Sequence, residues 1–214
     1  MAKRIRMAPT RSNLLRLREQ LKQARAGHAL LEHKREVLAH ELLVMIEDAE
    51  ATDADAQKRF GAAYDSLFDV RMRMGSDRLQ WASLAQAAEI RSEVALHSIM
   101  GVAVPLVQVE VDPLPLPYSL GDTSAALDEA RARWLAVGEL LGRLAETATA
   151  VWRLATELRK TQRRVNALEY VLIPQIEVTL QYITEVLEEQ EREAFVRAKR
   201  IKMQQPAAGE EAEP

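Results

Sequence analysis

The stretch Leu14-Leu-Arg-Leu17-Arg-Glu-Gln-Leu21-Lys-Gln-Ala24 places an apolar residue at every third or fourth position. This alternation of three and four continues unbroken to residue 49, and it is the spacing of core positions in a left-handed coiled coil. The core positions of this first segment are Leu14, Leu17, Leu21, Ala24, His28, Leu31, Arg35, Leu38, Leu42, Met45 and Ala49. Only His28 and Arg35 depart from the apolar pattern, so the spacing predicts a long helix that pairs with another helix along this face.

The limits of this helix are marked in the sequence. Pro9 cannot lie inside a helix, and the hydroxyl of Thr10 or Ser12 can accept a hydrogen bond from a free backbone N–H at the first turn. No proline and no evident stop follows until Gly75-Ser-Asp77. We therefore expect a helix over residues 10–74, about 95 Å long at ~1.5 Å per residue, after a basic extension over residues 1–9.

A second periodic segment is predicted over residues 122–203. Its core positions are Val137, Leu140, Leu144, Thr147, Val151, Leu154, Leu158, Thr161, Val165, Leu168, Leu172, Ile176, Leu180, Ile183, Leu187, Gln190 and Ala194. Three successive steps of four around Leu172 read as a stutter, which locally unwinds a supercoil. Pro174 removes a helix hydrogen bond at the same place, so we expect a bend there.

The simplest pairing of the two segments is with each other, antiparallel. If their ends match, Pro174 lies opposite Arg35–Leu38. Between them, residues 75–121 read as a small head with a short helix around 77–88, capped by Ser76, and a β-hairpin broken at Gly101. Pro105 implies an edge strand or a bulge. Residues 113–117 read as an extended connector and residues 204–214 as a disordered acidic tail. The predicted fold is mainly α-helical: a long antiparallel two-helix coiled coil with this small head.

Composition supports a thin body rather than a compact globule. Only 5% of the residues are aromatic, and aromatic rings bury the most area per residue. Trp81, Trp134 and Trp152 are expected to be packing anchors. The chain has no cysteine, no signal peptide pattern and no apolar run long enough to cross a bilayer. We therefore expect a cytoplasmic protein that does not insert into a membrane.

The residues that would carry catalysis or bind a metal are missing from the sequence. His40-Glu-Leu-Leu-Val44 begins like a zinc-protease motif but has Val44 in place of the second histidine. Asp53-Ala-Asp55 opens like a calcium loop, but Lys58 replaces the required glycine. No glycine-rich phosphate loop occurs. We expect no catalytic residue, no cofactor and no metal.

Two stretches carry a resemblance to a known family. One is Pro9-Thr-Arg-Ser-Asn-Leu-Leu-Arg-Leu-Arg-Glu-Gln-Leu21. The other begins with Arg163-Arg-Val-Asn-Ala-Leu-Glu169 and continues through Ile173-Pro174 to Arg197-Ala-Lys-Arg-Ile-Lys202. Together they resemble the D subunit of the V/A-type rotary ATPases and ATP synthases.

This resemblance implies a central rotor shaft that transmits torque. The implied partners are the catalytic A and B subunits, the F subunit, and a cap subunit that links to the membrane ring of proteolipids. The complex would be peripheral to the membrane and would not bind nucleic acid. Residues near both chain ends and in the polar group at 163–169 are candidates for partner contacts: Arg11, Asn13, Arg16, Arg18, Arg163, Arg164, Asn166, Glu169, Arg197, Lys199, Arg200 and Lys202. Pro174 is the candidate bend in the shaft.

Two other classes of protein fit a basic coiled coil. One is the coiled-coil stalk of a type III or flagellar export ATPase, which would lack the head. The other is a scaffold or nucleic-acid-binding protein, because the first 35 residues are rich in Lys and Arg. Such a protein would bind DNA with a steep salt dependence. Ordinary solvation of a charged helix face also accounts for these basic residues.

Overall fold

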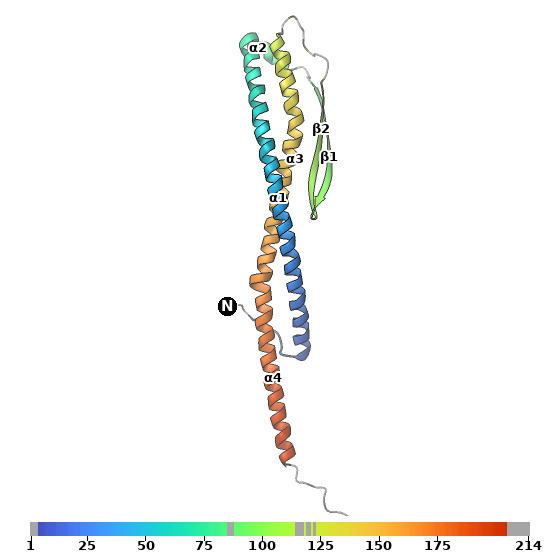
Figure 1. Cartoon of the computed structure of the whole chain (residues 1–214), viewed down its shortest axis with the longest axis vertical. Helices are drawn as coiled ribbons and strands as arrows, with labels where there is room; N and C mark the ends of the chain where they lie inside the picture. Colours follow the sequence, from blue (N-terminus) through green and yellow to red (C-terminus); the bar gives the residue numbers. More distant parts are fainter. Residues whose placement is uncertain (1–3, 85–87, 114–117, 119–120, 122, 205–214) are drawn as a thin grey trace, which may run out of the picture. The chain divides into compact units, whose positions relative to one another are not determined.

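The computed structural model describes residues 4–84, 88–113, 118, 121 and 123–204. It is mostly helical (Figure 1), with α1 (Arg11–Met74), α2 (Ser76–Ser83), α3 (Ala125–Ala167), the π-helical turn η1 (Leu168–Leu172) and α4 (Ile173–Gln204). Strands β1 (Ala88–Ile99) and β2 (Val102–Pro113) form a two-stranded hairpin. The predicted fold class, a helical coiled coil with a small hairpin-bearing head, is confirmed. The chain divides into two compact units: Met1–His33 with Thr161–Pro214 (unit 1), and Lys34–Lys160 (unit 2).

In unit 1, the first part of α1 lies antiparallel to α4. Arg11 pairs with Glu191 at 2.5 Å and Arg25 with Glu177 at 2.7 Å. The residue numbers of the paired residues therefore run in opposite directions along the two helices. Both ion pairs are exposed and each is worth only ~0–1 kcal/mol. The pairing is held instead by an apolar core in which Leu17, Ala24, Ile176 and Ile183 are buried. Burial of each large side chain stabilises the pair by ~1.5–3 kcal/mol.

The residues before α1 pack against α4 instead of extending freely. Thr10 is the N-cap, because its Oγ1 accepts from the backbone N–H of Asn13 at 3.3 Å. The Ile5 N–H donates to Thr179 Oγ1 at 3.0 Å, and Ile5 and Met7 pack on the core of unit 1. The Arg4 guanidinium stacks over the Tyr182 ring, 3.7 Å from its centroid.

The irregularity near Pro174 is a π-helical turn, not a stutter. The Ile173 N–H donates to the carbonyl of Leu168, five residues back. The core position after Leu168 is therefore Ile173, five residues later, and Ile176 is the next buried residue on the same face. Leu172, predicted in the core, is 39% exposed. Whether the helix also bends at Pro174 stays a prediction.

The expected pairing of Pro174 with Arg35–Leu38 is wrong. Glu177 pairs with Arg25, and Glu169 Oε2 lies 3.9 Å from His28 Nε2, so Pro174 lies opposite the turn between Arg25 and His28. The helix ends do not match because α4 continues from Glu191, the partner of Arg11, for another thirteen residues to Gln204. His28, not Arg35, is the polar core residue beside the irregular turn, and its buried Nε2 has no hydrogen-bond partner.

In unit 2, the rest of α1 pairs with α3, again antiparallel. Lys34 lies 3.9 Å from Glu157, and Arg133 donates to the carbonyl of Ala62 at 3.2 Å. Leu38, Val70, Val137 and Leu154 are fully buried. Trp134 packs edge-on against Phe60 and Tyr64, with ring centroids 6.2 and 5.1 Å away. Trp81 and Trp152 are not packing anchors, because they are 76% and 68% exposed.

The head differs in detail from the sequence prediction. Helix α2 ends at Ser83, five residues earlier than expected, and its N-cap is Gly75, with φ +82° and no side-chain cap, rather than Ser76. The hairpin register runs unbroken from Ile99↔Val102 to Ala88↔Pro113. Pro105 therefore causes no bulge and lies on an edge strand, as each strand of a two-stranded sheet must. Met100 and Gly101 have φ of 50° and 83°, as in a tight type I′ hairpin turn. Most of the predicted connector and the tail after 204 lie outside the described residues.

The hairpin docks on α3 through β2. Gly142 lets the strand approach closely: a Cβ there would lie only 2.4 Å from Val109 Cγ2. Two polar contacts follow this apolar one toward the C-terminal end of α3. The Val107 N–H donates to Glu146 Oε2 at 2.8 Å, and Arg153 Nη1 donates to the carbonyl of Ala103 at 2.7 Å. Backbone N–H and C=O groups on the free edge of β2 thus form hydrogen bonds with side chains of α3.

Candidate partner-binding surfaces

The end of α4 in unit 1 is a helix without a helical partner among the described residues. Helix α1 begins opposite Glu191, and every described residue from 188 to 203 is exposed. The core positions Gln190 and Ala194 are exposed for this reason, contrary to the sequence prediction. Phe195, Ile201 and Met203 are 71%, 61% and 78% exposed. We call residues 192–203 the α4 tip.

The α4 tip carries four of the predicted contact residues. Arg197 pairs with Glu193 one turn earlier, at 3.2 Å. Lys199, Arg200 and Lys202 are exposed, and none has an ion pair with another described residue. The tip therefore combines exposed apolar side chains with three cations, Lys199, Arg200 and Lys202, that no carboxylate of the described residues neutralises. Sequence reasoning identified the cations but missed Phe195, Ile201 and Met203, although their exposure follows from the absence of a partner helix.

The four predicted residues at the start of α1 have different surroundings. Arg11 is paired with Glu191. Asn13 Nδ2 donates to the carbonyl of Ala8 at 2.8 Å, which ties the N-terminal segment to the helix. Arg16 and Arg18 are exposed, with no ion pair among the described residues. Arg11 and Asn13 thus have a structural role that is independent of any partner.

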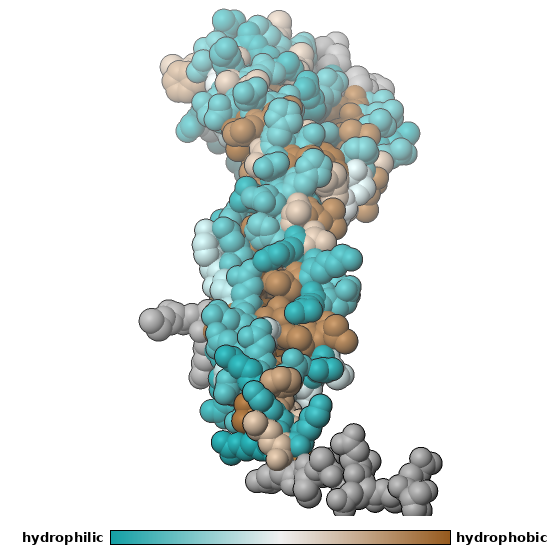
Figure 2. All heavy atoms as spheres, turned by 60° about the horizontal axis from the view of Figure 1, so that its bottom comes forward, coloured by the Kyte–Doolittle hydropathy of each residue, from teal (hydrophilic) through white to brown (hydrophobic). Residues whose placement is uncertain are grey.

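The polar group at 163–169 lies on another part of unit 1, near His28. Val165 is buried, while Arg163, Arg164 and Asn166 are exposed around it. Asn166 Oδ1 accepts from Gln162 Nε2 at 2.7 Å. The next turn, η1, exposes Tyr170 and Val171, two apolar residues outside the predicted core positions. Figure 2 shows such apolar side chains at the surface among hydrophilic ones.

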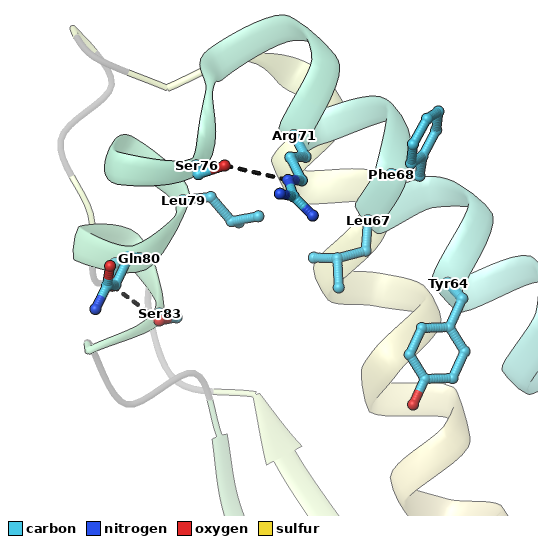
Figure 3. Close-up of a pocket in the computed structure, with 8 residues that line it drawn as sticks. All are labelled: Tyr64, Leu67, Phe68, Arg71, Ser76, Leu79, Gln80 and Ser83. Carbon is cyan, nitrogen blue, oxygen red and sulfur yellow. Dashed lines mark hydrogen bonds between the residues drawn. The ribbon is translucent and has the colours of Figure 1, made fainter.

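Unit 2 has a groove between the end of α1 and α2 that sequence reasoning did not predict (Figure 3). We call it the head groove. Its volume is about 570 Å³, and its lining residues are Tyr64, Leu67, Phe68, Arg71, Ser76, Leu79, Gln80 and Ser83. Most of this lining is apolar, and Arg71 is its one charged residue. The positive φ of Gly75 allows the turn that places α2 beside α1.

Across the described residues, no three His, Asp or Glu side chains gather in an arrangement that could hold a metal ion. In the same described part of the chain, no helix is both long enough and apolar enough to cross a membrane.

Comparison with known proteins identifies the family. Residues 13–203 match the family model described as the ATP synthase D subunit. The chain belongs to the ATP synthase D subunit family. It is 39% identical to the V-type ATP synthase D subunit of Thermotoga neapolitana over 196 residues, covering 92% of this chain and 97% of that protein. It is 38% identical to the A-type ATP synthase D subunit of Methanopyrus kandleri, covering 91% and 84%, and 38% identical to that of Pyrococcus furiosus, covering 92% and 94%.

The D subunit is a central stalk component of rotary ATPases, so the predicted family and its role in the central stalk are confirmed. The match extends through the hairpin and both periodic segments. The export-ATPase stalk and the nucleic-acid-binding scaffold are set aside by this match. Membership in the family places the chain in a complex with other subunits of a V/A-type ATP synthase.

Proposed function

We propose that this chain is the rotor shaft of a V/A-type rotary ATPase. It carries torque between a ring of alternating A and B subunits, which bind and turn over ATP, and an ion-translocating membrane ring. The chain itself is not catalytic and binds no cofactor. It works on the cytoplasmic face, peripheral to the membrane, and contacts the F subunit and a cap subunit above the proteolipid ring.

The α4 tip is the observation that supports this proposal. A helix that ends in water normally turns its apolar side chains toward a partner, because exposed apolar area is unfavourable. Here Phe195, Ile201 and Met203 stay exposed beside Lys199 and Lys202. Such a tip fits the bore of a ring whose wall offers apolar area and carboxylates. The cations attract the tip to the carboxylates of that bore. The apolar side chains form a contact that is non-directional and therefore needs no fixed orientation of the tip in the ring.

The polar group at 163–169 is the second proposed contact, either with the ring or with the F subunit. Arg163 and Arg164 are exposed and have no ion pair among the described residues. They can therefore pair with carboxylates of a partner without first breaking a bond inside the chain. Contacts through Arg16 and Arg18 follow the same reasoning, while Arg11 would first have to leave Glu191.

The experiment that tests the function is reconstitution with the A and B subunits. The chain is expressed with candidate A and B subunits, and the mass of the intact complex is measured. We expect one copy of the chain per ring of three A and three B subunits, and ATP-driven rotation of a bead attached to it. Failure to associate, or three copies per ring, contradicts the proposal.

A charge reversal in the α4 tip tests the surface itself. The variant Lys199→Glu with Lys202→Glu should weaken binding to the ring by about tenfold or more, because cations facing carboxylates become like charges. Lys58→Glu is the control, since Lys58 is also exposed on a helix but lies in unit 2. Equal binding by both variants rules out the tip as the ring contact.

A further inference from the structure

The head groove contains a positive charge in apolar surroundings. The Arg71 Nε donates to Ser76 Oγ at 3.1 Å. Figure 3 shows the guanidinium lying between α1 and α2, near Leu67 and Leu79. No carboxylate of the described residues lies within 4 Å of it. The Ser76 bond holds Nε, so the terminal guanidinium nitrogens remain available for a ligand with a negative charge.

The walls of the head groove are too exposed for a small molecule. Tyr64 and Phe68 are 59% and 61% exposed, whereas a small-molecule pocket encloses most of its ligand surface. Other apolar residues of this part of the chain are exposed as well: Met72 on α1, Trp81 on α2, and Leu84 directly after α2. A trough between two helices with an apolar floor is the kind of site that takes one face of a third helix.

We infer that the head groove binds an amphipathic helix of another subunit of the rotary complex. That helix places apolar side chains between α1 and α2 and sets one carboxylate against Arg71. A carboxylate is the favoured partner because a guanidinium that loses water on docking needs compensation, and a charge-assisted hydrogen bond is about twice as strong as a neutral one. A basic helix would repel Arg71, and an uncharged helix would offer it only a weaker, neutral acceptor. This inference rests on the proposed function, since it assumes that the chain works in a complex.

Arg73 provides a matched control for Arg71. Both are basic residues in the last turn of α1, both are exposed, and they are two residues apart. Two residues correspond to a rotation of about 200° around a helix, and Arg73 does not line the groove. Arg71→Glu and Arg73→Glu therefore make the same change in net charge on opposite sides of the helix.

The test uses the full chain in the assembled complex. A photo-reactive amino acid replaces Leu79, and the cross-linked partner is identified by mass spectrometry. We expect an adduct with an amphipathic, carboxylate-bearing helix of another subunit. Arg71→Glu should weaken binding of that partner by at least about tenfold, Arg71→Lys by less, and Arg73→Glu by less than about twofold. Binding to the A and B subunits should not change in any of these variants.

The outcomes separate the inference from the function on which it rests. If the unmodified chain does not associate with A and B, the proposed function fails. If it does associate, but Arg71→Glu behaves like Arg73→Glu, the inference fails and the function stands. An adduct only with a second copy of this chain, or no adduct in the complete complex, also overturns the inference. Equal helix content of both variants by circular dichroism excludes unfolding as the cause of a difference.

Discussion

The contact between Gly142 and the hairpin gives a sharp test of how β2 docks on α3. Replacing Gly142 with Ala would place a Cβ 2.4 Å from Val109 Cγ2 and 3.2 Å from Val109 Cβ. The first distance is far inside van der Waals contact, and the second shows that rotating the valine does not fully relieve it. The strand must therefore move away from the helix, and its bond from the Val107 N–H to Glu146 must lengthen or break.

Two opposing terms set the size of the effect. Alanine is favoured over glycine inside a helix by ~1 kcal/mol. Overpacking a well-packed contact costs ~1–3 kcal/mol. Gly61→Ala measures the first term alone, because Gly61 is also helical, lies in unit 2, and has nothing within 4 Å of a Cβ. The difference between Gly142→Ala and this control therefore gives the overpacking term. We expect Gly61→Ala to stabilise the unit by ~1 kcal/mol, and Gly142→Ala to be ~1–3 kcal/mol less stable than that control.

The assay is urea unfolding followed by circular dichroism, with hydrogen exchange at Val107 and Val109 as the local readout. The amide of Val107 should exchange faster in Gly142→Ala and at the normal rate in Gly61→Ala. Val109→Ala in the Gly142→Ala background removes the clashing methyl groups, so the two changes should be non-additive. If Gly142→Ala stabilises the unit as much as Gly61→Ala does, the hairpin does not dock at this depth.

Three further predictions concern the core, a half-buried tyrosine and the irregular turn. Leu17→Ala should destabilise unit 1 by ~2–5 kcal/mol because Leu17 is fully buried; Leu15→Ala, at an exposed neighbouring site, should change stability by ~0.5 kcal/mol or less in the same urea titration. Burial, then the hydrogen bond to Asp128, raises the pKa of Tyr118 to about 12 from 10.0. The folded state therefore favours the neutral phenol. The stabilisation that Tyr118 contributes is complete below pH 10 and should be lost as pH rises toward 12. The difference in urea midpoint between the unmodified chain and Tyr118→Phe should therefore shrink over that range, and a difference that stays constant contradicts the raised pKa. Pro174→Ala restores a backbone donor, so we expect a straighter helix and altered coupling of ATP hydrolysis to pumping; unchanged rotation and pumping would refute the proposed bend.

The paired helices could be predicted because each local signal agrees with the tertiary packing. Every predicted core position from Leu14 to Ala49 is buried or half-buried, including the polar His28 and Arg35. The alternation of three and four works as a predictor because a helix face repeats at 3.5 residues per turn in a coiled coil. Deviations appear where this repeat has no partner or changes its pitch, as at Ala194 in the α4 tip and at Leu172 in η1.

The docking surfaces could not be predicted in the same way. The close approach of Val109 to Gly142 joins a strand and a helix that are far apart in the sequence. A glycine within a helical pattern does not by itself indicate such a contact. The head groove depends on the turn at Gly75 and on the end of α2 at Ser83, neither of which the apolar spacing determines. Trp81 and Trp152 were misplaced for a related reason: a large aromatic residue marks burial, but a component of a complex can bury it against another chain.

The position of η1 shows how spacing can determine a backbone irregularity. Leu172 and Ile173 are both apolar, so the sequence allows a core that steps from Leu168 by four or by five. The structure takes five, because Ile173 packs on the core of unit 1 and Ile176 and Ile183 then follow at helical spacing. An α-helix would rotate those two residues about 100° out of the core, losing ~1.5–3 kcal/mol of burial for each. Pro174 adds to the preference, since it has no N–H to give to the carbonyl four residues back. Deleting Leu172 together with Pro174→Ala should therefore give an unbroken α-helix with the same residues in the core.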